Sequence, residues 1–577
     1  MPCGPDHSRP DIRPAATQSL SAIIEHPQKG SLLLAVAALL WLLPGFFSLP
    51  PIDRDESRFA QATRQMMQSG DLIDIRFQNV PRYKKPVGIY WLQAAANWLT
   101  GGAPEDPSIW RFRLPSLAAA LAALLLTAWM GCLLFSPPVG FLAGLVLAAA
   151  PLFGIEIRQA TTDTVLLALV LAAMVALLRV YLAEMRPAGP ASPGFGNALM
   201  FWLAIGGGLL IKGPVILFFI GLTALALALL EKRAGWLLRL YPLPGALLAL
   251  ALAAPWFFAI TAKSGGAFVQ QSLKHDFFAK ILSAQEGHAG LPGYYAATLF
   301  LGLWPFALPV GLAVFRLARR RGEPEIRFCI AWLVPAWLIL EMIPTKLPHY
   351  ALPLYSGLAL LTAYSISQNL SSLPSSAALW QRLLGYLNLG ATILIGIGIA
   401  GIGLWLPRFL HQPIDPMAWP YALVIAAAML VGSIMTARGR ALQGVVCLLV
   451  ASQLATLSVY GRLLPNLDVL WPSRIVAEAI HAYADCPSPR LASAGFSEPS
   501  LVFLLGTETQ LTDPAQTAAS LADHAGCRFA LVTEPARAAF DAAAAKETIP
   551  TEILAQFDAF NYSRGAWERL TLYAPRH

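Results

Sequence analysis

Apolar runs long enough to cross a bilayer recur along most of this chain, and they restrict its fold more than any other feature. The runs lie at residues 31–49, 113–135, 139–155, 161–183, 198–211, 213–231, 241–262, 293–316, 325–343, 348–368, 383–407, 418–436 and 439–462. A helix needs roughly 20 apolar residues to span the hydrocarbon core, so the runs predict about 13 transmembrane helices. The expected fold class is therefore an α-helical polytopic membrane protein.

The composition supports this class and argues against a nucleic-acid partner. Of the 577 residues, 56% are hydrophobic and 13% are charged, whereas roughly a quarter are charged in an ordinary soluble domain. The net charge of +8 comes from basic residues that lie between apolar runs. Such residues orient membrane helices and contact anionic lipids. We therefore expect membrane lipids as partners, and no nucleic acid.

The basic residues also predict an orientation. Short basic clusters occur at 232–233, 316–321 and 438–440, in alternate loops. Because basic loops stay in the cytoplasm, residues 1–29 are expected to form a cytoplasmic tail and 30–463 a transmembrane domain. Residues 50–112 then form a first loop on the outer side. An odd number of helices places residues 464–577 on that side as well.

Residues 464–577 differ in composition from the rest, since charge rises and the spanning runs stop. RLASAGF, SLVFLL, RFALVTE and ERLTLYA have the pattern of short strands, and the alanine-rich stretches 517–524 and 536–546 that of helices. A C-terminal α/β soluble domain is expected. Cys486 and Cys527 can form a disulfide there if the domain lies outside the cytoplasm.

The first loop carries a dense cluster of charge directly after the first apolar run, in PPIDRDESRFAQATRQMMQS. Phe59, Ala62, Met66 and Met67 recur there at helical spacing, which predicts an amphipathic helix at the membrane surface. The stretch 87–99 is apolar and rich in Tyr and Trp, and predicts a second surface helix.

Two carboxylates are the candidate catalytic groups. Asp53, Asp55 and Glu56 precede the first predicted helix, and acids favour a helix N-terminus. Three acids beside two arginines exceed what a cap needs, which predicts a catalytic or substrate-binding role for Asp55. Asp163 lies in RQATTD at the outer start of the 161–183 run. Two acids converging from separate loops suit general-base catalysis or the recognition of a sugar.

Basic side chains on the same outer face are candidates for binding an anionic group. Lys84 and Lys85 precede Pro86, and a lysine ammonium beside a bilayer is a natural partner of a lipid phosphate. Lys212 in IKGPV and Lys346 in TKLPHY stand alone next to apolar runs. Each is either a snorkelling anchor or a ligand contact, and both alternatives stay open.

The metal dependence is also open at this point. His275 and His288 lie in the 263–292 loop and are weak candidates for metal ligands. The sequence has no CxxC, HExxH or Walker motif. No cofactor is certain, and a divalent metal is a possibility.

The short polar motifs, taken in order, resemble those of a known family. DRDES, RYKKPVGIYW, RQATTD, IKGP and TKLPHYALP together are similar to the polyprenyl-phosphate-dependent GT-C glycosyltransferases of the protein O-mannosyltransferase type. More narrowly, they resemble the bacterial 4-amino-4-deoxy-L-arabinose transferases that modify lipid A. The resemblance implies an undecaprenyl phosphate-linked sugar as donor and lipid A, within lipopolysaccharide, as acceptor. It also implies an inner-membrane enzyme with its site facing the periplasm, conferring polymyxin resistance.

The same resemblance suggests roles for individual residues. Asp55 matches the first-loop acid of the family and Lys85 the lysine that holds the donor phosphate, while Asp163 matches a second acid with less distinctive spacing. The matching motifs also contain Arg58, Tyr83, Lys84, Lys212, Lys346 and Tyr350. Displacement is expected to invert the anomeric carbon, because no second carboxylate is evident as a nucleophile.

Two alternatives remain. One is transfer of mannose or another polyprenyl-linked hexose to a protein or a different lipid, in which Asp55 would be the general base. The other is a lipid flippase or transporter, which would place polar residues within the helices and show an internal repeat. The apolar runs contain almost no charge in mid-span, which disfavours a transporter.

Overall fold

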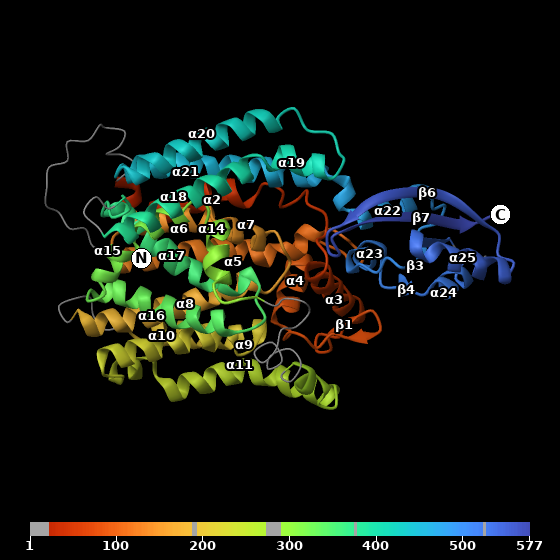
Figure 1. The fold of residues 1–577 in the computed structure, drawn as a ribbon. Coiled ribbons are helices and arrows are strands. Elements are labelled where there is room, and N and C mark those ends of the chain that lie inside the picture. The colour runs from red at the N-terminus through yellow and green to blue at the C-terminus, as the bar shows by residue number, and fades with distance from the viewer. Residues whose placement is uncertain (1–21, 187–192, 273–289, 374–377, 523–526, 577) are drawn as a thin grey trace.

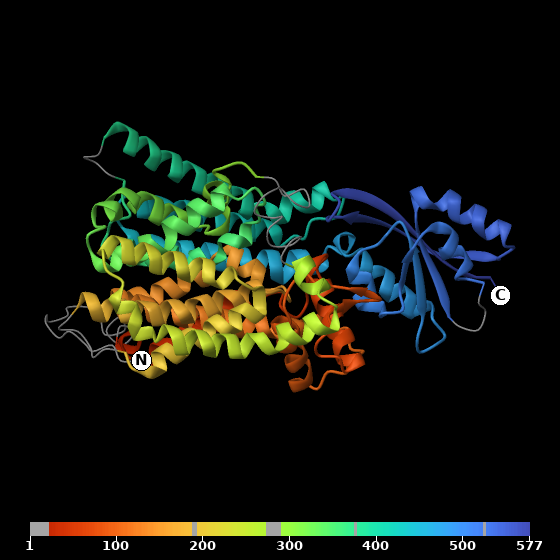
Figure 2. The same ribbon diagram turned by 90° about the horizontal axis from the view of Figure 1, so that it is seen from below.

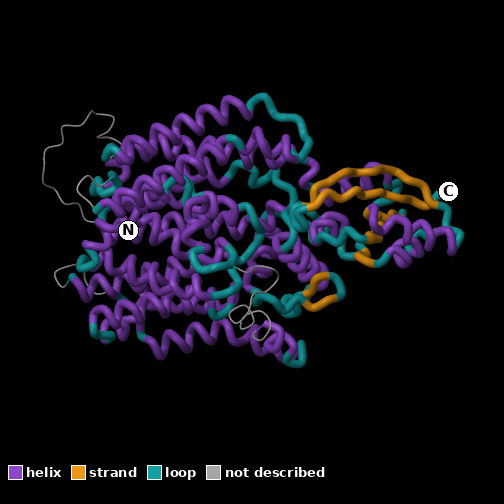
Figure 3. The backbone as a smooth tube through the Cα atoms, viewed as in Figure 1, coloured by secondary structure: helices purple, strands orange, loops and turns teal. Residues whose placement is uncertain are grey.

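The computed structural model describes residues 22–186, 193–272, 290–373, 378–522 and 527–576. A bundle of helices forms one part of the molecule, and a small sheet with its own helices lies beyond one end of the bundle (Figures 1 and 2). Strands are concentrated in that end domain, apart from a short hairpin in the first loop (Figure 3).

The bundle is built from α2 (Pro27–Leu42), α5 (Ile109–Leu134), α6 (Pro137–Ala148), α7 (Pro151–Ile157), α8 (Asp163–Met185), α9 (Phe195–Lys212), α10 (Val215–Glu231), η1 (Gly235–Leu240), α11 (Pro242–Lys263), α12 (Ala267–Val269), α14 (Tyr294–Gly302), α15 (Ala307–Arg319), α16 (Pro324–Met342), η3 (Pro348–Ala351), α17 (Leu352–Ser367), α18 (Leu379–Ala400), α19 (Ile402–Phe409), α20 (Ala418–Ala437) and α21 (Ala441–Thr456). Helices α8 and α17 are apolar on nearly every side and are buried in the bundle, as expected of helices without a polar face. The start of α8 and the end of α9 contribute to the site described below.

The number of spans differs from the sequence expectation. Within the described residues, seven helices are long and apolar enough to cross a membrane, or eight if the bent pair α6–α7 counts as one. Several predicted spans are interrupted: 139–155 bends by 67° between α6 and α7, 293–316 divides into α14 and α15, and 383–407 into α18 and α19. Pro151 and Pro305 lie at two of these breaks, where proline removes a backbone donor.

The first loop forms α3 (Asp55–Ser69), the hairpin β1 (Arg76–Phe77) and β2 (Val80–Pro81), and α4 (Gly88–Leu99). The apolar side of α3 is buried, as its spacing predicts, through Phe59, Ala62 and Met66. Its polar side is buried too, because Gln61 and Arg64 meet the C-terminal domain. Helix α3 is therefore enclosed between two parts of the protein, unlike the surface helix that its amphipathic pattern predicts.

Three short helical turns, η4 (Leu457–Leu463), η5 (Leu464–Asn466) and η6 (Asp468–Leu470), lead from the bundle into the C-terminal domain. That domain consists of α22 (Pro472–Tyr483), β3 (Arg490–Ala494), α23 (Pro499–Leu505), β4 (Gln510–Thr512), α24 (Pro514–Ala519), β5 (Arg528–Thr533), α25 (Glu534–Lys546), β6 (Thr551–Asn561) and β7 (Ala566–Pro575). The sheet order is β4-β3-β5-β7-β6. Strands β4, β3 and β5 are parallel, and β7 runs antiparallel to both β5 and β6.

The expected α/β domain is present, with one wrong assignment. SLVFLL, which has the apolar run of a buried strand, forms most of α23. Pro499 occupies the first turn of this helix, where its missing N–H is not needed. A short apolar run does not distinguish a buried helix from a buried strand. Cys486 and Cys527 form a disulfide.

Candidate functional site

A cavity of about 270 Å³ lies where the first loop meets the ends of several bundle helices. Its polar wall contains Lys84 and Lys85 from the segment after β2, Asp163 at the start of α8, Lys212 at the end of α9, and Tyr350 in η3. The remaining wall is apolar, with Phe218, Phe219, Phe257, Phe268, Leu340 and Ile343 among its side chains. The structure thus brings together five of the site residues predicted from sequence.

Asp163 and Lys212 form a buried ion pair in this cavity. The Lys212 Nζ donates to Asp163 Oδ1 at 2.5 Å, and both side chains are about nine-tenths buried. The same Nζ lies 5.4 Å from the centre of the Tyr350 ring, a geometry that stabilises a cation. Gly213 follows Lys212 with a φ of +62°, so glycine's freedom lets the chain turn between α9 and α10.

His349 and Glu156 belong to the same cluster, although the sequence did not identify either as a site residue. His349 lines the cavity, and its Nδ1 lies 3.7 Å from Glu156 Oε1, on α7. The charges of Asp163, Lys212, Asp55 and Lys85 all act on this imidazole. A buried acid inside an apolar run, as in IEIR, is the sequence signal that marks Glu156.

Asp55 lies at the first position of α3, beside the cavity wall and not among the residues that line it. Its side chain is 69% exposed, and Oδ1 lies 3.5 Å from Nη2 of buried Arg82. Arg82 donates to the Tyr90 hydroxyl at 3.2 Å and stacks 4.4 Å from the centre of the Phe59 ring. The guanidinium that orients Asp55 is therefore itself fixed by packing.

Arg58 lies one turn further along α3 and is half-buried. Burial lowers the pKa of its guanidinium, while the negative charge of Asp55 acts in the opposite direction. Arg58 and Arg82 therefore place two guanidinium groups near the exposed carboxylate of Asp55.

Tyr83 and Lys346 occupy different positions from the other predicted residues. The Tyr83 hydroxyl donates to Asp74 Oδ1 at 3.0 Å, and burial together with this hydrogen bond raises its pKa to about 12. The Lys346 Nζ donates to the carbonyl oxygens of Leu340, Glu341 and Ile343 at 3.2, 2.7 and 2.7 Å. These carbonyls end α16, and a cation at a helix C-terminus satisfies them.

Glu56, next to Asp55, is a structural residue that the sequence did not identify. Its carboxylate accepts from Arg113 Nε at 2.7 Å and Nη2 at 2.8 Å, and both side chains are fully buried. Glu56 also accepts from the backbone N–H groups of Ile52 and Ala160, each at 2.8 Å. This fully satisfied pair fixes the start of α3 against α5.

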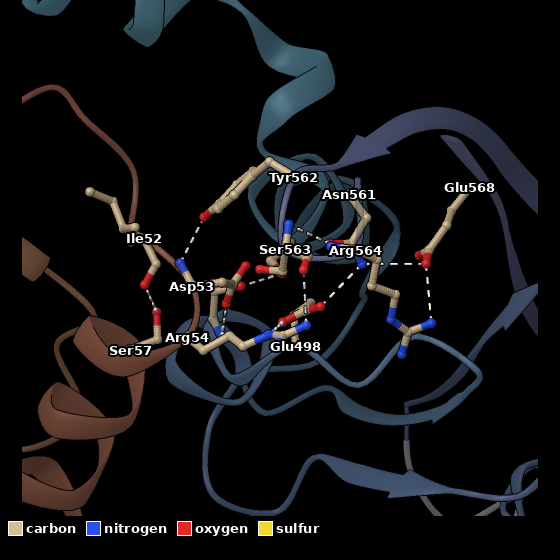
Figure 4. Close-up of polar contacts among 12 residues, drawn as sticks. Ile52, Asp53, Arg54, Ser57, Glu498, Asn561, Tyr562, Ser563, Arg564 and Glu568 are labelled. Atoms are coloured by element: carbon tan, nitrogen blue, oxygen red, sulfur yellow. Dashed lines mark hydrogen bonds and ion pairs between the residues drawn. The ribbon is translucent and has the colours of Figure 1, made fainter. Parts of the chain in front are cut away.

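The two residues before Asp55 join the first loop to the C-terminal domain (Figure 4). The Asp53 carboxylate accepts from the Ser500 N–H at 2.9 Å, and the Asp53 N–H donates to the Tyr562 hydroxyl at 2.7 Å. Arg54 donates to the Ser563 carbonyl at 3.1 Å, and its Nε lies 3.8 Å from Glu498 Oε2. The C-terminal domain thus holds the backbone from which Asp55 projects.

The metal hypothesis gains no support from the described residues. Among them, no group of three or more His, Cys, Asp or Glu side chains is arranged to hold a metal ion. His275 and His288, the two candidate ligands, lie outside the residues that the structure describes.

The arrangement suits an anionic group attached to a long apolar chain. Three lysines line the cavity together with phenylalanine and aliphatic side chains. Lysine binds phosphate through charge-assisted hydrogen bonds, and these are stronger where water is partly excluded.

Comparisons with known proteins identify relatives of this chain in sequence and in fold. Residues 84–258 match the family described as dolichyl-phosphate-mannose-protein mannosyltransferase. The chain is 29% identical to the undecaprenyl phosphate-alpha-4-amino-4-deoxy-L-arabinose arabinosyl transferase of Pectobacterium carotovorum, over 67% of each protein. It is 30% identical to the protein of the same name from Aeromonas salmonicida, over 56% of this chain and 59% of that relative.

Solved structures share the fold across nearly the whole chain. ArnT from Cupriavidus metallidurans in the apo state superposes with a TM-score of 0.71, covering 98% of this chain and 100% of that one, at 17% identity. The same protein bound to undecaprenyl phosphate gives a TM-score of 0.70, covering 95% and 99%, at 17% identity. In sequence the chain is thus similar to membrane arabinosyl transferases, and in fold it is similar to ArnT over nearly its whole length.

Proposed function

We propose that this protein transfers 4-amino-4-deoxy-L-arabinose from undecaprenyl phosphate to a phosphate group of lipid A. The observation that carries the proposal is one cavity lined both by apolar side chains and by Lys84, Lys85 and Lys212. A polyprenyl chain matches the apolar wall, and its phosphate matches the lysines. The named relatives are arabinosyl transferases that use undecaprenyl phosphate, which supports this choice of donor.

The lysines would bind the donor phosphate and stabilise it as it leaves. Negative charge grows on the phosphate oxygen as the glycosidic bond breaks, and fixed cations nearby lower the energy of that state. Lys85 would be the principal contact. Lys212 is already paired with Asp163 at 2.5 Å, so its share in phosphate binding depends on how that pair rearranges when the donor enters.

Asp55 would act on the acceptor or the sugar without serving as a strong base. A lipid A phosphate is largely ionised near neutral pH, since the second pKa of a phosphomonoester is about 6. We therefore assign Asp55, held by Arg82, to orienting the acceptor or binding the sugar ammonium. Attack by a phosphate oxygen on the anomeric carbon, with departure of the polyprenyl phosphate, inverts that carbon.

Hexosyl transfer to a hydroxyl group is the alternative, because the matching family description names a mannosyltransferase. A hydroxyl nucleophile must lose its proton, so Asp55 would then be the general base. The two alternatives differ in the product formed.

The proposed location is the bacterial inner membrane, with residues 1–29 in the cytoplasm and residues 50–112 and 464–577 in the periplasm. The alternate basic loops support this orientation. It places the cavity, the first loop and the C-terminal domain on the side where the acceptor glycolipid is exposed.

Mass spectrometry of lipid A from cells with and without this protein tests the function. We expect a pentosamine increment on lipid A phosphate that depends on the protein, and with it resistance to polymyxin. Unchanged lipid A under inducing conditions would rule out this acceptor, and a hexose increment on a protein or another lipid would favour the alternative.

A further inference from the structure

A second and larger cavity lies in the C-terminal domain, in residues to which the proposed transfer assigns no role. We call it the C-terminal groove. It measures about 1120 Å³, and Gly495, Thr533, Glu534, Trp567 and Glu568 line it together with His411 from the bundle. Its size exceeds that of a typical small-molecule pocket, roughly 300–1,000 Å³.

The groove lies at the switch point of the sheet. Strand β4 follows β3 in the chain and lies on one side of it in the sheet. The chain then passes through α24 to β5, which lies on the other side of β3, so the strand order reverses between β3 and β5. Gly495 follows the end of β3, and Thr533 ends β5. In open α/β sheets, ligands bind outside the carboxyl ends of the strands at this point.

The side chains of the groove match a hydroxylated ligand with apolar ring faces. Trp567 remains 42% exposed, although its ring lies 5.7 Å from Phe560 and 6.0 Å from His411 between ring centres. Asp558, Arg564 and Arg569 also line the groove, and Arg569 Nε donates to Asp558 Oδ1 at 2.8 Å. Glu568 Oε1 accepts from Arg564 at 3.2 Å, whereas its buried Oε2 has no hydrogen-bond partner among the described residues. A buried carboxylate oxygen normally has one.

We propose that the C-terminal groove binds the saccharide that extends from the glycolipid acceptor. An indole face stacks on the apolar face of a sugar ring, and carboxylate and guanidinium groups bind its hydroxyls. The domain lies beyond the ends of the bundle helices (Figures 1 and 2), where a sugar chain growing out from a membrane-anchored lipid would pass. The proposal rests on the proposed function, which supplies a glycolipid acceptor.

A chain of polar contacts joins the groove to the first loop (Figure 4). Glu568 Oε1 also accepts from Asn561 Nδ2 at 3.3 Å, and the same Nδ2 donates to Glu498 Oε1 at 3.1 Å. Glu498 pairs with Arg54, the residue before Asp55. A saccharide on Glu568 is thereby connected to the backbone that carries the candidate catalytic acid.

A role of the groove can be distinguished from a role of the transfer site by comparing two acceptors. One is lipopolysaccharide that carries its core oligosaccharide, and the other is lipid A alone. We expect Trp567→Ala to lower one ratio about tenfold, that of kcat/KM for the extended acceptor to kcat/KM for lipid A. The change should come mainly through KM, as it does when an aromatic contact to the ligand is lost. Glu568→Gln should lower the ratio in the same direction and is the gentler change. Tyr483→Ala, which removes a 49% exposed aromatic on α22, is the matched control and should leave the ratio unchanged.

Direct binding gives a second measurement that does not depend on transfer. Core oligosaccharide released from lipid by mild acid should bind the full-length wild-type protein in calorimetry, and Trp567→Ala should abolish the signal. Unchanged ratios together with absent binding would overturn the groove proposal while leaving the transferase intact. If the wild type modifies neither acceptor, the proposed function fails, and the oligosaccharide titration still decides whether the groove binds saccharide.

Discussion

Adjacent acids at the start of α3 have different tasks. Asp55 is mostly exposed and contacts Arg82, whereas Glu56 is fully buried in a bidentate pair with Arg113. The two acids have the same side-chain chemistry. They differ because adjacent positions on a helix face different directions, so that one is exposed and the other is buried. The exposed acid is available to substrate, while the buried one supports the fold.

Asp55→Asn and Glu56→Gln should therefore separate activity from stability. We expect Asp55→Asn to reduce the rate of transfer at least about 100-fold, the usual range for a group that acts in the transition state. The free energy of unfolding of this variant should change by less than about 0.5 kcal/mol. Glu56→Gln should lower the free energy of unfolding by about 3–5 kcal/mol, because it leaves a buried guanidinium without its charge partner. Thermal melts and transfer assays on purified protein measure both. An Asp55→Asn variant with full activity would show that the site is misplaced.

Lys346 and Lys85 both lie in short polar motifs, but their surroundings in the structure differ. The three carbonyls that Lys346 binds end α16, and Lys85 lines the cavity. We expect Lys346→Met to lower Tm, and Lys85→Met to weaken binding of undecaprenyl phosphate with little change in Tm. Binding titrations in detergent and melting curves check this. Equal losses of Tm in the two variants would contradict it.

The segment before α3 adds a pH-sensitive contact between two elements, the first loop and α23. Burial raises the pKa of the Asp53 carboxyl to about 7, with a further increase from Glu498 and an opposing effect from Arg58 and the Ser500 hydrogen bonds. Tyr562 and Arg54 face the same place. Because the folded state holds this proton more tightly than the unfolded chain, the contribution of Asp53 to stability is full below about pH 4 and is lost as pH rises through about 7.

Asp53→Asn should remove this dependence, because an amide oxygen can still accept the Ser500 N–H without carrying charge. We expect the difference in Tm between Asp53→Asn and wild type to be larger at about pH 8 than at about pH 5. Melting curves at the two pH values measure it. The same difference at both would mean that Asp53 is ionised throughout this range.

At the scale of the whole molecule, the C-terminal domain and the bundle enclose α3 between them. Arg64 on α3 donates to the Phe503 carbonyl at 2.5 Å, and Gln61 donates to Thr507 at 2.8 Å. The C-terminal domain therefore belongs to the architecture of the site, since it covers the helix that begins with Asp55.

The disulfide between Cys486 and Cys527 tests the side of the membrane on which this domain lies. Disulfides persist in the periplasm and are rare in the cytoplasm. We expect neither thiol to react with a bulky maleimide in intact, unreduced protein. Both should react after reduction and unfolding, and a gel shift measures the labelling. Cys486→Ser should expose Cys527 to the reagent after unfolding alone. Reactive thiols in unreduced protein from cells would place the domain in the cytoplasm.

The sequence by itself determined the class of protein, because spanning apolar runs and basic loops follow from the physics of the bilayer. It also located the lysines of the cavity, because polar motifs between apolar runs are costly beside a membrane. It did not distinguish Lys346 from Lys212, since both lie in similar motifs and only packing shows which one meets helix carbonyls. Glu156 carried only the signal of an acid beside an apolar run, and His349 carried no pattern of its own. The enclosure of α3 and the contact between Asp53 and Ser500 depend on residues more than 400 positions apart, and tertiary structure alone decides such pairings.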